Sequence, residues 1–326
     1  MAERLEALQG WLKQELGLDE VVLEPASGDA SFRRYFHLTR PDGRTAIAMD
    51  APPGPEDCRP FVDMAQQLRA LGVHVPEVLA QDLARGFLLL EDLGSRHYLD
   101  ELTPQTVDRL YGDAMGALVT VQALGPRDGL PAYDRALLLQ EMGLFREWLV
   151  GRHLGIQLTA EENRMLEQAF ELLIDNALQQ PQVCALRDFH SRNLMLTDSH
   201  NPGVLDFQDA VIGPVTYDLV SLLKDCYIAW PRPRVEAWVE GYFELALQSG
   251  VLPREHEKPF LRWFDLMGVQ RHLKAAGIFA RLKQRDGKGG YLGDIPRTLG
   301  YVVEMGGVYP ELAELGAFCE RVVAGL

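Results

Sequence analysis

The sequence has few of the features that mark a disulfide-bonded, metal-stapled or membrane-spanning protein. The 326 residues include only four cysteines, at Cys58, Cys184, Cys226 and Cys319. They are scattered and form no Cys-x-x-Cys pair, so we expect neither a disulfide framework nor a zinc site, and we predict buried free thiols. No stretch approaches about 18 uninterrupted apolar residues, which argues against a transmembrane helix and a membrane partner.

Positive charge is also scarce. The chain has 32 Lys and Arg against 47 Asp and Glu, which gives a formal net charge of −15. A nucleic-acid partner would require a positive surface for its phosphates, so we predict none. Nothing in the sequence indicates an obligate protein partner.

The N-terminus lacks the basic start and apolar block of a signal peptide. Instead Leu5, Leu8, Leu12 and Leu16 recur at helical spacing, which predicts an amphipathic first helix. We therefore expect a cytoplasmic protein.

Short β-type runs follow the first helix. Strands are predicted at residues 21–24, 34–38, 45–49, 78–80 and 87–90, with a helix at 57–71 and a hairpin turn at 40–43. From residue 104 the pattern is mostly helical, with long amphipathic stretches at 104–123, 133–153 and 159–179 and one strand-rich island at 183–206. The inferred architecture is α+β and bilobal: a small antiparallel β-rich lobe (1–94, with a hinge near 91–94) and a larger helical lobe (95–326).

The island carries the clearest chemical signal. Asp188 is followed five residues later by Asn193 and then by an apolar run. This spacing matches the catalytic loop of kinases, where the aspartate reaches the acceptor hydroxyl and the asparagine turns back toward a metal ion. We predict that Asp188 orients the hydroxyl and accepts its proton. His190, inside the loop, could contact the substrate or equally brace the loop.

A second carboxylate, Asp206, closes another apolar run thirteen residues after Asn193. Because Mg²⁺ prefers oxygen ligands, Asn193 and Asp206 are the predicted magnesium ligands, with Asp209 as a supporting residue. Either segment alone would be better explained by an aspartate that caps a strand or turn. The two in this order and spacing favour a kinase.

The segments 188–193, 205–210 and 213–219, together with the connector 89–94 and the N-terminal strands, resemble the aminoglycoside and choline phosphotransferase superfamily. The resemblance covers nearly the whole chain and implies a protein-kinase-like fold that uses ATP and Mg²⁺. It also implies that Asp218 braces the catalytic loop and that the backbone of Glu91 and Leu93 binds the adenine edge.

The chain departs from that pattern at two positions that matter for catalysis. Leu186 stands where a histidine is usual, and Met49 occupies the nucleotide-site position of the phosphate-binding lysine. The helix that would supply the partner glutamate offers Asp63 or Met64. The loss of the lysine and the loss of its glutamate partner are consistent with each other, because a buried glutamate without its lysine would be an uncompensated charge.

A small-residue turn could hold the nucleotide phosphates instead. Ser27, Gly28 and Ser31 offer backbone and hydroxyl donors, and Arg33 or Arg34 could supply the missing cation. An ordinary polar hairpin would explain this turn nearly as well.

Residues 269–288 are basic within an acidic protein. Arg271, Lys274 and Arg281 are spaced to share one side of a helix. A solvated helix face is the usual explanation of such a charge run. We predict instead that these three side chains bind a neutral or anionic acceptor, since a polycationic aminoglycoside would need an acidic pocket.

The segments 28–36, 49–53 and 270–282 resemble one bacterial branch of the superfamily, the anomeric sugar kinases of cell-wall recycling. That resemblance implies ATP-dependent phosphorylation of the anomeric hydroxyl of N-acetylmuramate or N-acetylglucosamine. The residue patterns alone lead only to a small-molecule kinase.

Three alternatives remain open at this stage. The acceptor could be an aminoglycoside, choline or another hexosamine. Met49 and Leu186 would suit a pseudokinase, although the intact Asp188, Asn193 and Asp206 oppose it. A hydrolytic metal site would need a His-rich pattern that the sequence does not contain.

Overall fold

The computed structural model describes residues 2–28 and 32–326. The chain divides into two compact units, each of which is described by itself. The first comprises the residues up to Arg96 together with Met195–Asp209, and the second comprises His97–Leu194 together with Ala210–Leu326. The sequence-based boundary at residue 94 lies close to the end of the first stretch, but it left residues 195–209 with the helical lobe.

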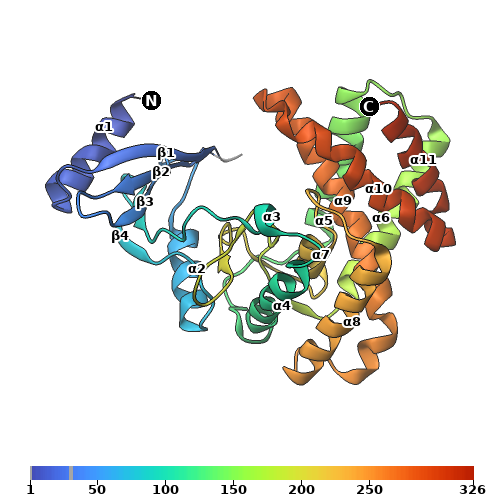
Figure 1. The fold of residues 1–326 in the computed structure, drawn as a ribbon. Coiled ribbons are helices and arrows are strands. Elements are labelled where there is room, and N and C mark those ends of the chain that lie inside the picture. The colour runs from blue at the N-terminus through green and yellow to red at the C-terminus, as the bar shows by residue number, and fades with distance from the viewer. Residues whose placement is uncertain (1, 29–31) are drawn as a thin grey trace. The chain divides into compact units, whose positions relative to one another are not determined.

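The first unit is built on an antiparallel sheet with strand order β1-β2-β3-β5-β4 (Figure 1). Its elements are α1 (Ala2–Gly10), η1 (Trp11–Glu15), β1 (Val22–Gly28), β2 (Arg34–Thr39), β3 (Thr45–Asp50), α2 (Arg59–Ala70), β4 (Val78–Asp82) and β5 (Phe87–Leu90). All predicted strands and both helices are confirmed. The predicted hairpin turn is confirmed too, because the amide of Gly43 donates to the carbonyl of Arg40 at 2.9 Å and Gly43 has a left-handed φ of +83°.

The N-terminal helix is held against the sheet by its apolar side. Leu8, Trp11 and Leu12 are buried in one cluster with residues of β2, β3 and β5. The rings of Trp11 and Phe87 lie 5.8 Å apart between centroids. The helical spacing of the leucines thus reports real burial, and this apolar contact stabilises the sheet.

Residues 195–209 belong to the first unit because of specific contacts. The amide of Val204, in β8 (Gly203–Val204), donates to the carbonyl of His74 at 2.8 Å, and the amide of Leu196 donates to the carbonyl of Arg96 at 2.7 Å. The ring of Phe207 packs on Phe61 of α2 at 4.9 Å. Such long-range contacts cannot be read from local sequence patterns.

The second unit is mostly helical. Its elements are α3 (Tyr98–Glu101), α4 (Val107–Leu124), α5 (Arg135–Leu144), η2 (Phe145–His153), α6 (Ala160–Leu178), β6 (Gln182–Ala185), β9 (Val211–Pro214), α7 (Tyr217–Leu223), α8 (Arg232–Gln248), η3 (Arg254–His256), α9 (Glu257–Asp286), η4 (Gly289–Asp294), α10 (Ile295–Val308), η5 (Pro310–Leu312) and α11 (Ala313–Ala324). The short strand β7 (Leu194–Met195) pairs with β8. The three long helical stretches predicted from periodicity are confirmed as α4, α5 with η2, and α6.

Helix α9 is the centre of this unit. It packs against α5, α6, α7 and α10 (Figure 1). Most of its side chains between Phe260 and Leu282 are buried. Strands β6 and β9 pair antiparallel, with Ala185 opposite Val211. A small antiparallel sheet followed by a helical majority confirms the predicted α+β class.

Two further expectations are tested by the fold. All four cysteines are buried free thiols, as predicted. Over residues 2–28 and 32–326, no helix is long and apolar enough to cross a membrane.

Candidate active site

The loop that carries Asp188 starts where β6 ends, and α7 fixes its first residues. The carboxylate of Asp218 accepts hydrogen bonds from the amides of Leu186 at 2.6 Å and Arg187 at 2.8 Å. Arg187 has a left-handed φ of +75°, a strained conformation for a non-glycine residue. Burial raises the pKa of Asp218 to about 6, against the opposing effect of the two amide donors. Asp218 therefore holds a strained turn directly before Asp188.

The rest of the loop is a tight turn with its own anchor. The amide of His190 donates to the carbonyl of Asp188 at 3.0 Å, and the side-chain nitrogen of Asn193 donates to the same carbonyl at 3.0 Å. Asp225, fully buried, accepts from both the amide (3.0 Å) and the hydroxyl of Ser191. The sequence analysis missed Asp225, because nothing in its local pattern distinguishes it from a carboxylate that follows a helix.

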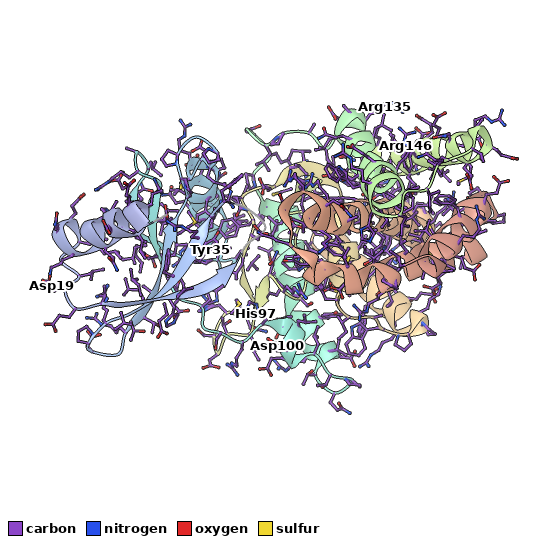
Figure 2. The ribbon with its side chains drawn as sticks, turned by 90° about the horizontal axis from the view of Figure 1, so that it is seen from above. Asp19, Tyr35, His97, Asp100, Arg135 and Arg146 are labelled. Atoms are coloured by element: carbon purple, nitrogen blue, oxygen red, sulfur yellow. The ribbon has the colours of Figure 1, made fainter. Side chains whose placement is uncertain are left out.

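His97, which directly precedes α3 in the chain and is labelled in Figure 2, fixes the end of the loop near Arg192. Its Nδ1 lies 2.9 Å from the carbonyl oxygen of Arg192, to which it can donate a hydrogen bond. The amide of Leu99 donates to the carbonyl of Ser191 at 3.1 Å. The backbone of the loop is therefore fixed from several directions before any ligand binds.

The carboxylate of Asp188 is the predicted reactive group of this loop. It is partly accessible to solvent, and no described residue of the second unit donates a hydrogen bond to it. Burial alone would raise its pKa, but the charges of Lys274, His190 and Arg271 more than offset this and hold the pKa of Asp188 below its ordinary value. Asp188 is thus an ionised carboxylate with its acceptor positions available.

Among the described residues of the second unit, the cations around Asp188 do not donate hydrogen bonds to its carboxylate. Lys274 forms an ion pair with Glu141 at 3.2 Å and donates to the hydroxyl of Tyr217 at 2.8 Å. Arg187 forms a close ion pair with the same carboxylate. Among the described residues, Arg271 donates to a weak acceptor, the sulfur of Cys226, at 3.7 Å. These side chains therefore act on Asp188 through their charge and not through contact.

Glu141, in α5, is the centre of a buried polar network that the sequence analysis did not find. It accepts from Arg187, Lys274 and the hydroxyl of Tyr133, and Gln270 donates to that hydroxyl at 2.9 Å. Burial would raise the pKa of Glu141, but the charges of Lys274 and Arg187 hold it below its ordinary value. A buried carboxylate with three donors is a stable arrangement, whereas the same group without them would be costly.

Of the three basic residues of α9 that were predicted to bind the acceptor, two do not lie on a solvated helix face. Arg271 and Lys274 are buried, with 6% and 7% of their surface exposed, and only Arg281 is partly exposed. The usual explanation of a charge run is therefore wrong for Arg271 and Lys274. Their role in binding an acceptor stays a prediction.

His190 is a buried side chain of the loop. Its ring meets that of Tyr227 edge-on at 5.4 Å between centroids. Burial and the neighbouring Arg271 and Arg192 lower the pKa of His190, against the opposing charges of Asp225 and Asp188.

In the first unit, the two arginines predicted to bind the nucleotide phosphates, Arg33 and Arg34, have different partners. Arg34 binds the fully buried carboxylate of Asp50, which also binds Arg4. This ion pair gives Arg34 a role in stabilising the fold. Arg33 forms an ion pair with Glu56 at 3.1 Å. Burial lowers the pKa of Arg33, but the nearby Tyr35, Glu56 and Asp209 raise it overall, so the guanidinium is charged beside Asp209.

The other predicted nucleotide-binding residues are placed as follows. Met49 is fully buried in β3, Gly28 ends β1 opposite Arg34, and Ser31 lies outside the described residues, as does the side chain of Ser27. The amide of Glu91 donates to the carbonyl of Glu77 at 2.9 Å, while its carboxylate pairs with Arg69 at 3.1 Å. Leu93 is partly buried beside Gly203.

Asp206 belongs to the first unit, whereas Asp188 and Asn193 belong to the second. Asp206 has a left-handed φ of +58°, and its carboxylate accepts from Gln208 at 2.6 Å. The same amide nitrogen lies 3.3 Å from the carboxylate of Asp209. Like Arg187, Asp206 is a non-glycine residue in a strained backbone conformation, which is common at functional positions.

The oxygen donors suit magnesium chemically. In the second unit, Asn193 donates through its amide nitrogen to the Asp188 carbonyl, and its amide oxygen lies at the other end of the group. In the first unit, Asp206 carries a carboxylate. Mg²⁺ typically takes one or two such protein ligands and completes its shell with phosphate and water. In the described part of the chain, no three or more His, Cys, Asp or Glu side chains are grouped to hold a metal by themselves.

Comparison with known proteins identifies the family. The model of the phosphotransferase enzyme family matches residues 22–258, and the chain belongs to this family. The predicted enzyme class, a phosphotransferase, is therefore confirmed.

Two curated relatives carry the same name. The chain is 52% identical to an N-acetylmuramate/N-acetylglucosamine kinase of Pseudomonas aeruginosa, over 93% of this chain and 89% of the relative. It is 48% identical to the protein of that name in Pseudomonas putida, over 99% of this chain and 97% of the relative.

Among solved structures, the ADP-bound aminoglycoside phosphotransferase APH(2'')-Ib is similar in fold. It has a TM-score of 0.59 at 15% identity and covers 90% of this chain and 97% of its own. This likeness confirms the predicted protein-kinase-like fold.

Proposed function

We propose that this chain transfers a phosphate group from ATP to the anomeric hydroxyl of N-acetylmuramate or N-acetylglucosamine, in the cytoplasm. The names of relatives up to 52% identical support the choice of these sugars. The observation that carries the mechanism is the carboxylate of Asp188, ionised and without a hydrogen-bond donor among the described residues of its unit.

Asp188 would orient the sugar hydroxyl and accept its proton as the hydroxyl oxygen attacks the γ-phosphate. A base that is already ionised and fixed in place needs little reorganisation during the reaction, and a positioned base typically contributes about 10²–10⁴ in rate. Because Asp218, Asp225 and His97 hold the loop backbone, Asp188 is presented in one orientation.

Asn193 and Asp206 would hold Mg²⁺ together with the nucleotide phosphates, and the ion neutralises charge on the phosphate oxygens when it is bound. Asp209 would support this site through Gln208, which lies within hydrogen-bond distance of both carboxylates. The backbone near Glu91 and Leu93 would contact the adenine.

Arg33 would replace the missing lysine as the cation for the nucleotide phosphates. Arg34 is bound to Asp50, while Arg33 is a charged side chain of the same turn that lies near Asp209. We expect Arg33→Gln to raise KM for ATP about tenfold, the value of one charge-assisted hydrogen bond. Arg34→Gln is the matched control, and it should lower the melting temperature more than it changes KM for ATP. The reverse pattern would assign the phosphate to Arg34.

Phosphorus NMR tests the reaction itself. The protein is incubated with ATP, Mg²⁺ and each sugar, and the product is examined for coupling between phosphorus and the anomeric proton. We expect a sugar 1-phosphate from at least one of the two sugars. A product from choline or an aminoglycoside and none from either sugar would overturn the proposal.

A further inference from the structure

A cluster of aromatic rings surrounds one arginine of the catalytic loop. The rings of Phe279 and Tyr291 are stacked, with centroids 5.5 Å apart and an angle of 14° between the planes. Tyr227 lies 6.3 Å from Phe279. The guanidinium carbon of Arg192 lies 3.7 Å from the centroid of Tyr227 and 5.6 Å from that of Tyr291. These three rings and Arg192 are referred to as the aromatic shelf.

Arg192 differs from the other cations near Asp188 in its accessibility. Its side chain is exposed, whereas Arg271 and Lys274 are buried. Among the described residues of the second unit, no carboxylate forms an ion pair with Arg192. Stacking on Tyr227 holds the flat face of the guanidinium and leaves its edge, where the N–H donors lie, open to a ligand.

The position of Arg192 is also fixed through its backbone. Its carbonyl faces Nδ1 of His97 at 2.9 Å, and the preceding residue, Ser191, is held by Asp225. A cation that is already ordered loses little conformational entropy when it binds an anion, so more of the interaction energy appears as affinity.

The aromatic shelf adjoins the reactive group. Tyr227 contacts His190, which lies two residues after Asp188 in the same turn, and Arg192 lies two residues further. A sugar whose hydroxyl reaches Asp188 would therefore extend over these rings. Aromatic rings suit the apolar C–H face of a pyranose, and a guanidinium edge suits a carboxylate through two parallel hydrogen bonds.

We propose that Arg192, held on the ring of Tyr227, is the specificity residue that binds the carboxylate of an acidic amino sugar, while the ring of Tyr291 contacts the sugar. This inference rests on the proposed function and deepens it, since the carboxylate is what distinguishes N-acetylmuramate from N-acetylglucosamine. It adds an exposed cation to the acceptor-binding residues predicted on α9, of which Arg271 and Lys274 are buried. Arg192 was not singled out by its pattern.

The test compares three sugars in one assay: N-acetylmuramate, N-acetylglucosamine and the neutral amide of N-acetylmuramate. The values of kcat/KM are measured for the wild type and Arg192→Gln. We expect Arg192→Gln to lower kcat/KM for N-acetylmuramate at least tenfold more than for N-acetylglucosamine, the effect of one lost charge-assisted pair. The wild type should discriminate against the amide, and Arg192→Gln should lose that discrimination.

Two controls separate the outcomes. Arg164→Gln removes an exposed arginine of α6 and should leave all three values as in the wild type. Arg192→Lys keeps the positive charge but cannot donate two parallel hydrogen bonds to a carboxylate. It should therefore show more of the preference for N-acetylmuramate than Arg192→Gln does. If Arg192→Gln lowers the values for all three sugars equally, or raises KM for ATP instead, the inference is wrong while the proposed function stands. If the wild type phosphorylates none of the sugars, the proposed function itself fails.

Discussion

Two aspartates, one in each unit, lie among positively charged side chains but in opposite arrangements. Asp50, at the end of β3, is fully buried, and its two oxygens bind the guanidinium groups of Arg4 and Arg34. Asp188 is partly accessible, and the cations around it direct their hydrogen bonds to Glu141, Tyr217 and Cys226. The same kinds of side chain therefore build a closed ion pair in one unit and an open carboxylate in the other.

The difference separates two uses of a carboxylate: stabilisation of the fold at Asp50 and, by our proposal, reactivity at Asp188. A carboxylate that is saturated with donors has no position left for a ligand, and it mainly holds its neighbours together. A carboxylate that is stabilised by charge at a distance keeps its hydrogen-bonding capacity for a substrate. The neighbours of Asp188 can act at a distance because Glu141 holds two of them in place.

Asp188→Asn should produce the largest effect on activity. We expect kcat to fall about 10²–10⁴-fold, the usual contribution of a positioned base, with little change in melting temperature because no described residue of the second unit donates to this carboxylate. Steady-state kinetics and thermal unfolding measure the two quantities. Asp128→Asn, at an exposed position, is the control. A variant that retained more than a tenth of kcat would contradict the role of Asp188.

Asp50→Asn should show the opposite pattern. The free energy of unfolding should fall by about 3 kcal/mol, because removal of one partner leaves two arginines without their counter-charge. Denaturant unfolding checks this value. At temperatures where the variant is folded, kcat should stay within about twofold of the wild type. A large loss of kcat with unchanged stability would break the comparison between the two aspartates.

Asp218→Asn tests how far the loop before Asp188 depends on its buried anchor. An amide can accept from one of the two backbone donors but not from both, so we expect a loss of about 1–3 kcal/mol in unfolding free energy. The pKa of Asp218 is raised to about 6 from an ordinary 3.8. Its contribution to stability is therefore full below pH 3.8 and is lost as the pH rises through about 6. The variant should lack this component, and an unchanged pH dependence of unfolding would refute the raised pKa.

Much of the fold was accessible from the sequence because its signals are local. The leucine spacing of the first helix, the hairpin turn at Gly43 and the helical periodicity of residues 159–179 each describe neighbouring residues. The spacing of Asp188 and Asn193 was also readable, since both lie in one turn and the side chain of Asn193 bonds to the carbonyl of Asp188.

The electrostatic setting of the site was not accessible from the sequence. Glu141, Arg187 and Lys274 meet from three distant parts of the chain, and no local pattern pairs them. The basic stretch of α9 resembled a solvated face because charges alone do not reveal burial. Arg192 was overlooked for a related reason: its partners, Tyr227 and Tyr291, are brought to it only by tertiary packing.

The central claim is that the carboxylate of Asp188 is kept ionised by nearby charges. The most direct test measures kcat/KM as a function of pH in two matched variants and compares the pH at which activity is lost on the acidic side, the acidic limb of the profile. Lys274→Met removes a positive charge near Asp188, and this removal favours the protonated form. The pKa of Asp188 should therefore rise, and activity should be lost at higher pH than in the wild type. Glu141→Gln removes a negative charge from the same network, so its limb should stay at the wild-type position or move to lower pH. Opposite responses support the account. If both variants shift the limb in the same direction, the cations around Asp188 only support the structure, and the account is wrong.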